Sequence, residues 1–165
     1  MFRAGEPPTG WRRPTFDDPS GPLLPTGVSG VIRQLVLATI AAAVVMFPLD
    51  FLWLRTMRPF YESQMGSIML SEPRIAAALL FYAVYAAGIA FFAIQPNLGT
   101  GTIWSAAAYG AVLGLVAYGT YDATNYATLK DFPALVMIVD WTWGTVLTAV
   151  VAAAGWALMR LLGSV

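Results

Sequence analysis

The chain contains neither cysteine nor histidine. The absence of cysteine excludes disulfide bonds and thiol chemistry. Both absences together exclude the common zinc and haem sites and the Ser-His and Cys-His catalytic pairs, because each of these needs an imidazole or a thiolate. Any chemistry must therefore come from carboxylates, tyrosines, hydroxyl groups or arginines. We expect no cofactor, and an enzyme is the less favoured class of protein.

Charged residues are scarce. They form 11% of the 165 residues, where about 25% is usual. Hydrophobic residues form 58%, and the mean hydropathy is +0.67. The net charge is zero, and we find no cluster of basic residues interleaved with aromatic ones that could follow a phosphate backbone. Most of the chain must face lipid or other apolar helices, and nucleic acid is not an expected partner.

Residues 1–30 lack an apolar stretch long enough to build a helix or a strand. They contain six prolines and five glycines, which predicts an extended or disordered polar tail. The tail is not a signal peptide, because a signal peptide has seven or more apolar residues after a short basic region. We therefore expect the first apolar span to direct the chain to the membrane and to remain there.

Four apolar windows are present, at 32–54, 75–94, 103–121 and 133–158. Each is close to the roughly 20 residues that a helix needs to cross a hydrocarbon core of about 30 Å. Residues 31–163 are therefore predicted to form an all-α integral membrane domain, a four-helix up-and-down bundle. Residues 55–74 would connect the first two helices, and residues 122–132 would connect the last two. The third window contains Gly110 and Gly114 after Ala106, a spacing that favours close packing against a neighbouring helix of the same chain over homodimerisation.

Three aspartates interrupt the apolar windows. Asp50 lies near the end of the first, Asp122 follows the third, and Asp140 lies about two turns into the fourth. In an up-and-down bundle all three lie on the same side of the membrane. A carboxylate within the span costs roughly 2.5–3.5 kcal/mol, so it usually faces the bundle interior or water and has a partner. The three aspartates therefore predict a shared polar pocket near one membrane surface.

Helical spacing adds neighbours to this pocket. Side chains three, four or seven residues apart share a helix face, and this places other polar and aromatic groups beside the aspartates. Tyr61 is instead expected in the aromatic belt at the membrane interface. The candidate ligand-binding residues are Asp50, Trp53, Tyr118, Tyr121, Asp122, Asn125, Asp140 and Trp143.

The chemistry of the pocket stays open at this point. Paired carboxylates can share a proton, because two like charges at close range do not both ionise cheaply. They can bind a divalent cation, with Asn125 or water completing the ligand shell, although the spacing matches no known metal motif. They can also bind a cationic or hydroxylated headgroup. In the alternative interpretation, each aspartate only bonds to a tryptophan, tyrosine or arginine of a neighbouring helix and fixes the packing.

Five segments of the chain resemble the bacterial membrane-protein family called domain of unknown function 2177. They are LDFLWL at 49–54, RPFYESQMG at 58–66, FYAVYAAGIAFF at 81–92, YGTYDATNYATLKDFP at 118–133 and VDWTWGT at 139–145. The resemblance spans about 35–158 and implies a small four-helix, multi-pass protein of the bacterial inner membrane, with no particular activity. The Pro-rich tail departs from the family, whose members usually begin almost directly with the first helix. The residues that match the family signature are Asp50, Trp53, Tyr61, Tyr118, Tyr121, Asp122, Thr124, Asn125, Thr128, Lys130, Asp140, Trp143, Gly144 and Thr145.

Three functions agree with these observations. The first is a membrane protein that handles a lipid or a small molecule in the one-sided carboxylate pocket, with membrane lipids as partners. The second is a structural or assembly subunit of a larger membrane complex, held to other subunits through the tail. The third is an enzyme that uses its carboxylates on a lipid substrate.

Overall fold

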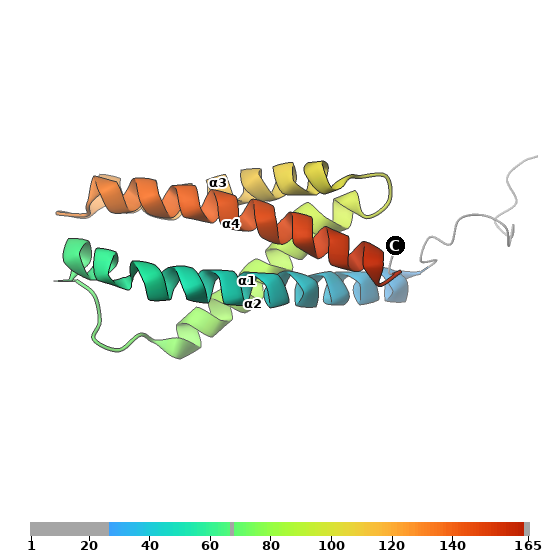
Figure 1. The fold of residues 1–165 in the computed structure, drawn as a ribbon, viewed down its shortest axis with the longest axis horizontal. Coiled ribbons are helices and arrows are strands. Elements are labelled where there is room, and N and C mark those ends of the chain that lie inside the picture. Colours follow the sequence, from blue (N-terminus) through green and yellow to red (C-terminus); the bar gives the residue numbers. More distant parts are fainter. Residues whose placement is uncertain (1–26, 67, 164–165) are drawn as a thin grey trace, which may run out of the picture.

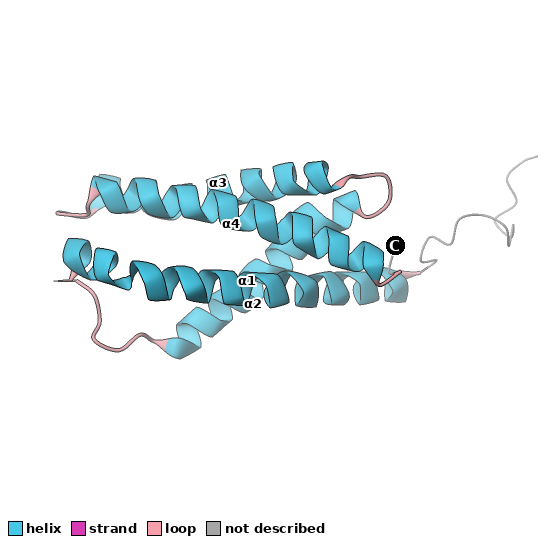
Figure 2. Cartoon of the chain, viewed as in Figure 1, coloured by secondary structure: helices cyan, strands magenta, loops and turns pink. Residues whose placement is uncertain are grey.

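The fold of the chain is known from a computed structural model, which describes residues 27–66 and 68–163. Four long helices follow one another: α1 (Val28–Met65), α2 (Ile75–Ile89), α3 (Ile103–Thr128) and α4 (Ala134–Leu161). α2 continues as a π-helical turn, η1 (Ala90–Ile94), and a 3-10 turn, η2 (Gln95–Asn97). The described part of the chain contains no strand (Figure 2). The predicted all-α class is confirmed.

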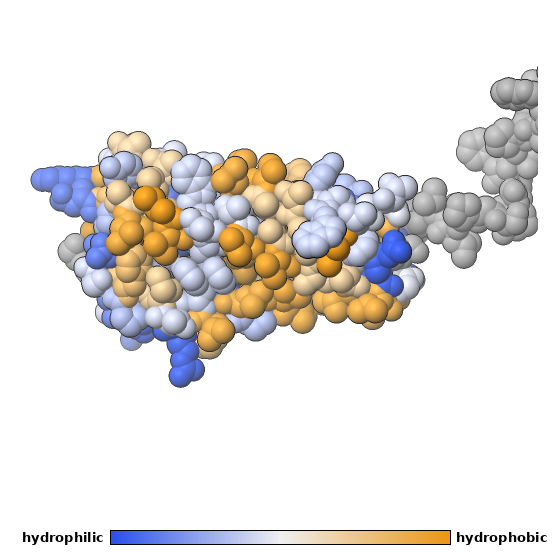
Figure 3. Space-filling model, turned by 45° about the horizontal axis from the view of Figure 1, so that its top comes forward, coloured by the Kyte–Doolittle hydropathy of each residue, from blue (hydrophilic) through white to orange (hydrophobic). Residues whose placement is uncertain are grey.

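The helices form an up-and-down bundle (Figure 1). α1 and α3 end where α2 and α4 begin, and we call this the carboxylate end of the bundle. α2 crosses the other helices obliquely. All four helices, with α2 extended to Asn97, are long and apolar enough to span a membrane. Strongly hydrophilic residues gather at the two ends of the face drawn in Figure 3, and apolar residues cover much of the surface between them.

α3 and α4 pack with their backbones almost in contact. A Cβ at Gly110 would lie 2.5 Å from the backbone oxygen of Thr148, and a Cβ at Gly114 would lie 2.5 Å from that of Gly144. Ala106, one turn earlier, is fully buried. The small residues of α3 therefore bring two helices of one chain together, as expected for such a stripe in a membrane.

The first helix is longer than the sequence predicted. The apolar window ends at residue 54, but α1 continues to Met65 and includes Pro59. Apolar contacts stabilise this extension: Tyr61 is buried in a cluster with Phe132, just before α4, and Val136, in its first turn. The hydropathy of the sequence shows where the apolar window ends. The turns of α1 beyond that window are stabilised by packing against the start of α4. The connection to α2 is accordingly shorter than predicted.

The third helix also continues past its predicted end at residue 121. Polar residues lower the hydropathy there, but their hydroxyl groups are bonded within the helix: Thr120 donates to the carbonyl of Val116 and Thr128 to that of Thr124, both at 2.6 Å. Such local bonds let threonine remain inside a helix. Asp122 is therefore an interior residue of α3. The predicted tail, except for its last four residues, lies outside the described part of the chain.

Candidate functional site

Asp50, on α1, is buried, and each of its carboxylate oxygens accepts a hydrogen bond. Trp143, on α4, donates its indole Nε1 to Oδ1 at 3.0 Å, and Tyr82, on α2, donates its hydroxyl to Oδ2. One side chain thus joins three helices. A buried carboxyl group is costly unless its oxygens are paired, and these two donors explain how a membrane-spanning segment accommodates Asp50.

Asp140, on α4, lies nearer the carboxylate end and is bonded to the extension of α1. Tyr61 donates its hydroxyl to Oδ1 of Asp140 at 2.6 Å. The same hydroxyl oxygen accepts a hydrogen bond from Nε1 of Trp53 at 3.1 Å. Tyr61 is only 8% exposed, so its hydroxyl group needs these partners. Asp140 itself is partly exposed, because it also faces open space.

The indole rings of Trp53 and Trp143 join the two carboxyl groups. The rings are stacked, with centroids 4.1 Å apart and planes within 3° of parallel. Contacts therefore run without interruption from Asp140 through Tyr61, Trp53 and Trp143 to Asp50. Asp140 and Asp50 are also near enough to interact electrostatically.

Asp122, on α3, differs from both. It is 0% exposed, yet neither carboxyl oxygen has a hydrogen-bond partner within residues 27–66 and 68–163. It interacts electrostatically with Asp140 and with Tyr61. The fold thus brings Asp122 towards Asp140 and, within the described part of the chain, provides no hydrogen-bond donor for Asp122. A buried carboxyl group without a partner is unfavourable, and the packing of the four helices does not account for this one.

The remaining candidates on α3 occupy separate positions. The ring of Tyr118 lies so close to Gly144 that a Cβ there would overlap it. The same ring makes an edge contact with Tyr85, with centroids 6.0 Å apart. Tyr121 is 61% exposed. The backbone carbonyl of Asn125 accepts the N–H of Leu129, the residue after α3, and Asn125 lines neither of the cavities that Asp140 borders.

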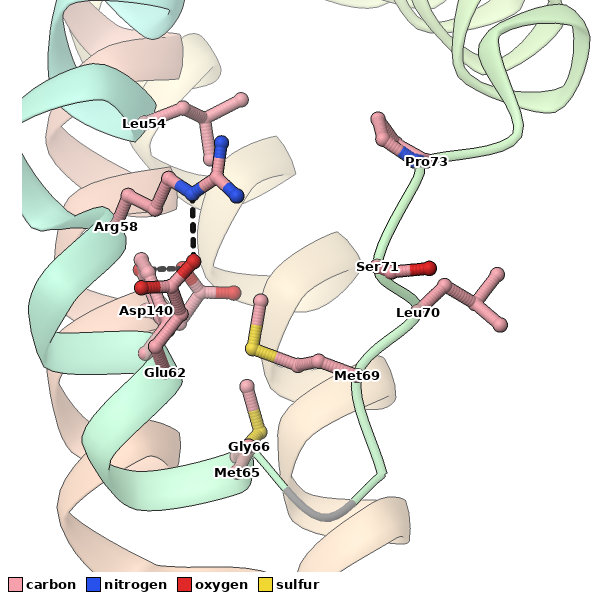
Figure 4. A pocket seen from close by; sticks show the side chains of 11 residues that line it. Leu54, Arg58, Glu62, Met65, Gly66, Met69, Leu70, Ser71, Pro73 and Asp140 are labelled. Carbon is pink, nitrogen blue, oxygen red and sulfur yellow. Dashed lines mark hydrogen bonds and ion pairs between the residues drawn. The ribbon is translucent and has the colours of Figure 1, made fainter.

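A cavity of about 600 Å³ lies between the extension of α1, the following connection and α4. Figure 4 shows Arg58, Glu62 and Asp140 on one side of it and Ser71 and Pro73 on the other. Arg58 forms an ion pair with Glu62, with Nε 2.6 Å from Oε1. Charged and apolar groups thus line the same space. The described lining residues are Leu54, Arg58, Tyr61, Glu62, Met65, Gly66, Met69, Leu70, Ser71, Pro73 and Asp140.

Asp140 also borders a second cavity, of about 390 Å³. The other lining residues come from α2 and α3: Phe81, Ala117, Tyr118 and Tyr121. α2 and α3 contribute only apolar and aromatic residues to this lining, so Asp140 is its one charged group within the described chain. Asp140 therefore lies between a mixed cavity and a mainly apolar one.

A metal site receives no support from the described residues. Within residues 27–66 and 68–163, no three Asp, Glu, His or Cys residues are grouped closely enough to hold a metal ion. The predicted cation ligand Asn125 belongs to the end of α3. Asp50 is thus bonded on both oxygens, Asp140 is bonded to Tyr61 and borders two cavities, and Asp122 is buried and lines neither of them.

Two tyrosines of the site lie outside the predicted candidate set. The sequence patterns do not indicate Tyr82, and they indicate Tyr61 as a residue of the interfacial belt and of the family signature but not as a ligand-binding candidate. Both donate their hydroxyl groups to aspartates. A tyrosine within an apolar segment needs an acceptor for its hydroxyl group, and that rule was the available signal. This rule does not identify the acceptor, because the sequence does not show how α2 is oriented against α1.

The fold and the site together define a multi-pass helical membrane protein with four candidate spans and a buried aspartate bonded to tyrosine and tryptophan. A family described as "Predicted membrane protein (DUF2177)" matches residues 35–157, and the chain belongs to this family. No curated protein and no solved structure matches the chain. The resemblance inferred from the five segments is therefore confirmed.

Proposed function

We propose that this protein binds an amphiphilic lipid or a similar small molecule at the carboxylate end of its bundle. The observation that carries the proposal is the cavity of about 600 Å³ that Arg58, Glu62 and Asp140 share with apolar side chains. Its volume lies within the range of about 300–1,000 Å³ that is common for ligand pockets. A lining that is partly charged and partly apolar fits a molecule with a polar head and an apolar chain.

The expected depth of this cavity supports an amphiphile. Arg33 and Arg55 are separated by about 33 Å along α1, close to the hydrocarbon thickness of about 30 Å. Arg160 and Asp140 are separated by about 30 Å along α4. If these arginines mark the membrane surfaces, Asp50 lies about 7 Å inside the hydrocarbon and Tyr61 about 9 Å outside it. The cavity would then lie at the level of the lipid headgroups.

The connection between α1 and α2 agrees with this depth. Its residues Ile68 and Leu70 are 62% and 57% exposed, and Met69 is 39% exposed. Apolar side chains exposed in a connection are typical of a segment that rests in the membrane interface. Met69 also lines the cavity, so this connection would separate the cavity from the membrane interface, and a lipid would enter beside it.

The role of Asp50 under this proposal is structural. Both of its oxygens are used by Tyr82 and Trp143, and it lines neither of the two cavities that Asp140 borders. Asp140 would contact the ligand, and Tyr61 with Trp53 would orient its carboxyl group. The bacterial inner membrane is the proposed location, because proteins that span the outer membrane are β-barrels; membrane fractionation of the producing cell tests this.

Filling the cavity tests the proposal. The protein is purified in a mild detergent, and the lipids that remain bound are counted by native mass spectrometry. Met69→Trp should reduce the bound lipid at least tenfold, because the indole would occupy the cavity. Ile68→Trp is the matched control, since Ile68 is its neighbour and is not part of the lining. If both variants retain the same lipid as the unaltered protein, the lipid is not in this cavity and the proposal is wrong.

A further inference from the structure

Some charged groups among the described residues around the cavity are paired and one is not, and the unpaired group indicates the chemistry of the ligand. Glu62 is paired with Arg58, and this pair is neutral as a whole. Asp140 receives a hydrogen bond from Tyr61, but a phenol neutralises no charge. Asp122 is fully buried, has no hydrogen-bond partner in the described residues and lines neither cavity. Among the described residues, Asp140 therefore borders the cavity without a paired cation.

A cationic group in the cavity would supply what the carboxyl group of Asp140 lacks. It would pair with Asp140 directly, because Asp140 borders the cavity. A primary ammonium fits this position better than a quaternary one. Quaternary ammonium groups are recognised by cages of several aromatic rings, and Tyr61 is the aromatic residue of the described lining.

Arg58 indicates the second charge of the ligand. Its ion pair with Glu62 uses the Nε atom, and the two terminal nitrogens of the guanidinium extend towards the cavity (Figure 4). Guanidinium groups bind phosphate through such paired donors. Arg58 and Asp140 border the same cavity, so a molecule within it meets an anion-binding group and a cation-binding group.

We propose that the ligand is an amphiphile whose head carries a phosphate next to a primary ammonium, as in phosphatidylethanolamine, with the ammonium at Asp140 and the phosphate at Arg58. This inference rests on the proposed function and specifies its ligand. The apolar residues of the lining, Leu54, Met65, Met69 and Leu70, would contact the first part of the acyl chains.

Short-chain lipids test the inference on the full chain in detergent. Dihexanoyl phosphatidylethanolamine, dihexanoyl phosphatidylglycerol, dihexanoyl phosphatidylcholine and free phosphoethanolamine are titrated by calorimetry. We expect the ethanolamine lipid to bind at least tenfold more tightly than the glycerol and choline lipids. Free phosphoethanolamine should bind weakly; if it binds as tightly as the lipid, a soluble molecule is the ligand and the lipid assignment is overturned.

Three variants assign the preference to residues. Asp140→Asn keeps an acceptor for Tyr61 and should abolish the preference for ethanolamine over glycerol. Asp122→Asn should change the preference less than Asp140→Asn does, because Asp122 lines neither cavity. Asp131→Asn is the matched control: Asp131 is exposed, lies at the same end and has a φ of 63°, a conformation that Asn also accepts. This control should leave the preference unchanged.

Arg58→Gln provides a test at an exposed position, where folding is not at risk. It should weaken the binding of all three lipids by a similar factor, because each carries a phosphate. If Asp140→Asn retains the preference, or if the glycerol lipid binds as well as the ethanolamine lipid, the inference is wrong and an amphiphile site without ammonium recognition remains. If none of the lipids binds the unaltered protein, the proposed function itself fails.

Discussion

The aspartates at the carboxylate end lie at two levels of the bundle, and their hydrogen bonding differs between the two. We call the level of Asp50 the inner level and that of Asp122 and Asp140 the outer level. At the inner level, Asp50 is buried with a donor on each oxygen, supplied by Tyr82 and Trp143. At the outer level, Asp122 is buried with no hydrogen-bond partner in the described residues, and Asp140 has one bonded oxygen and borders two cavities. The inner level has the pattern of a structural link, and the outer level has the pattern of a binding site.

The difference in hydrogen bonding distinguishes carboxyl groups that stabilise the fold from carboxyl groups that can bind a ligand. Polar groups that serve only the fold are satisfied by the fold, because an unsatisfied buried group destabilises it. Asp140 has one carboxylate oxygen beyond its bond to Tyr61 and borders two cavities, so a partner beyond the four helices can reach it. Stability measurements and binding measurements should accordingly separate the two levels.

Removing the carboxyl group of the inner level should have the largest effect on stability. Asp50→Ala leaves the hydroxyl of Tyr82 and the indole N–H of Trp143 without an acceptor, and each lost partner costs about 1–3 kcal/mol. We expect a loss of about 2–4 kcal/mol in the free energy of unfolding, measured by detergent denaturation followed by circular dichroism. Glu72→Ala, at an exposed acidic residue of the α1–α2 connection, is the control. Equal stability of the two variants would contradict a structural role for Asp50.

At the outer level, removal of a carboxyl group should have the opposite sign. Asp122→Leu replaces an unpaired buried carboxyl group by an apolar side chain of similar size. Such replacements are neutral or stabilising by about 1–3 kcal/mol. The same denaturation experiment measures the change. A loss of more than about 1 kcal/mol would show that the fold does use this carboxyl group, and the contrast between the two levels would disappear.

The sequence predicts one part of this arrangement better than the other. Four apolar windows and three aspartates were sufficient to predict the helices and the end at which Asp50, Asp122 and Asp140 lie, because helix direction alternates in an up-and-down bundle. The donors were harder to predict. Tyr82 reaches Asp50 because α2 crosses the bundle obliquely, and Tyr61 reaches Asp140 because α1 continues beyond its apolar window. Both depend on packing between helices, which hydropathy does not measure.

Removing the shared hydroxyl of Tyr61 should destabilise the fold less than removing the carboxyl group of Asp50. Tyr61→Phe keeps the buried ring and removes the group that donates to Asp140 and accepts from Trp53. We expect a loss of about 1–2 kcal/mol in unfolding free energy and weaker lipid binding, because the carboxyl group of Asp140 would no longer be oriented. Tyr109→Phe, on the exposed face of α3, is the control. If Tyr61→Phe leaves lipid binding unchanged, Tyr61 serves only the fold.

The ion pair at the cavity should contribute least to stability. Arg58 and Glu62 have side chains that are 67% and 49% exposed, and exposed pairs of this kind contribute about 0–0.5 kcal/mol on helices. Glu62→Gln should therefore leave the unfolding free energy nearly unchanged. It should nevertheless strengthen the binding of dihexanoyl phosphatidylglycerol about two- to threefold, because the charge of Arg58 would no longer be neutralised by its neighbour. A change in stability without a change in this affinity would mean that Arg58 contributes to the helix and does not meet the phosphate.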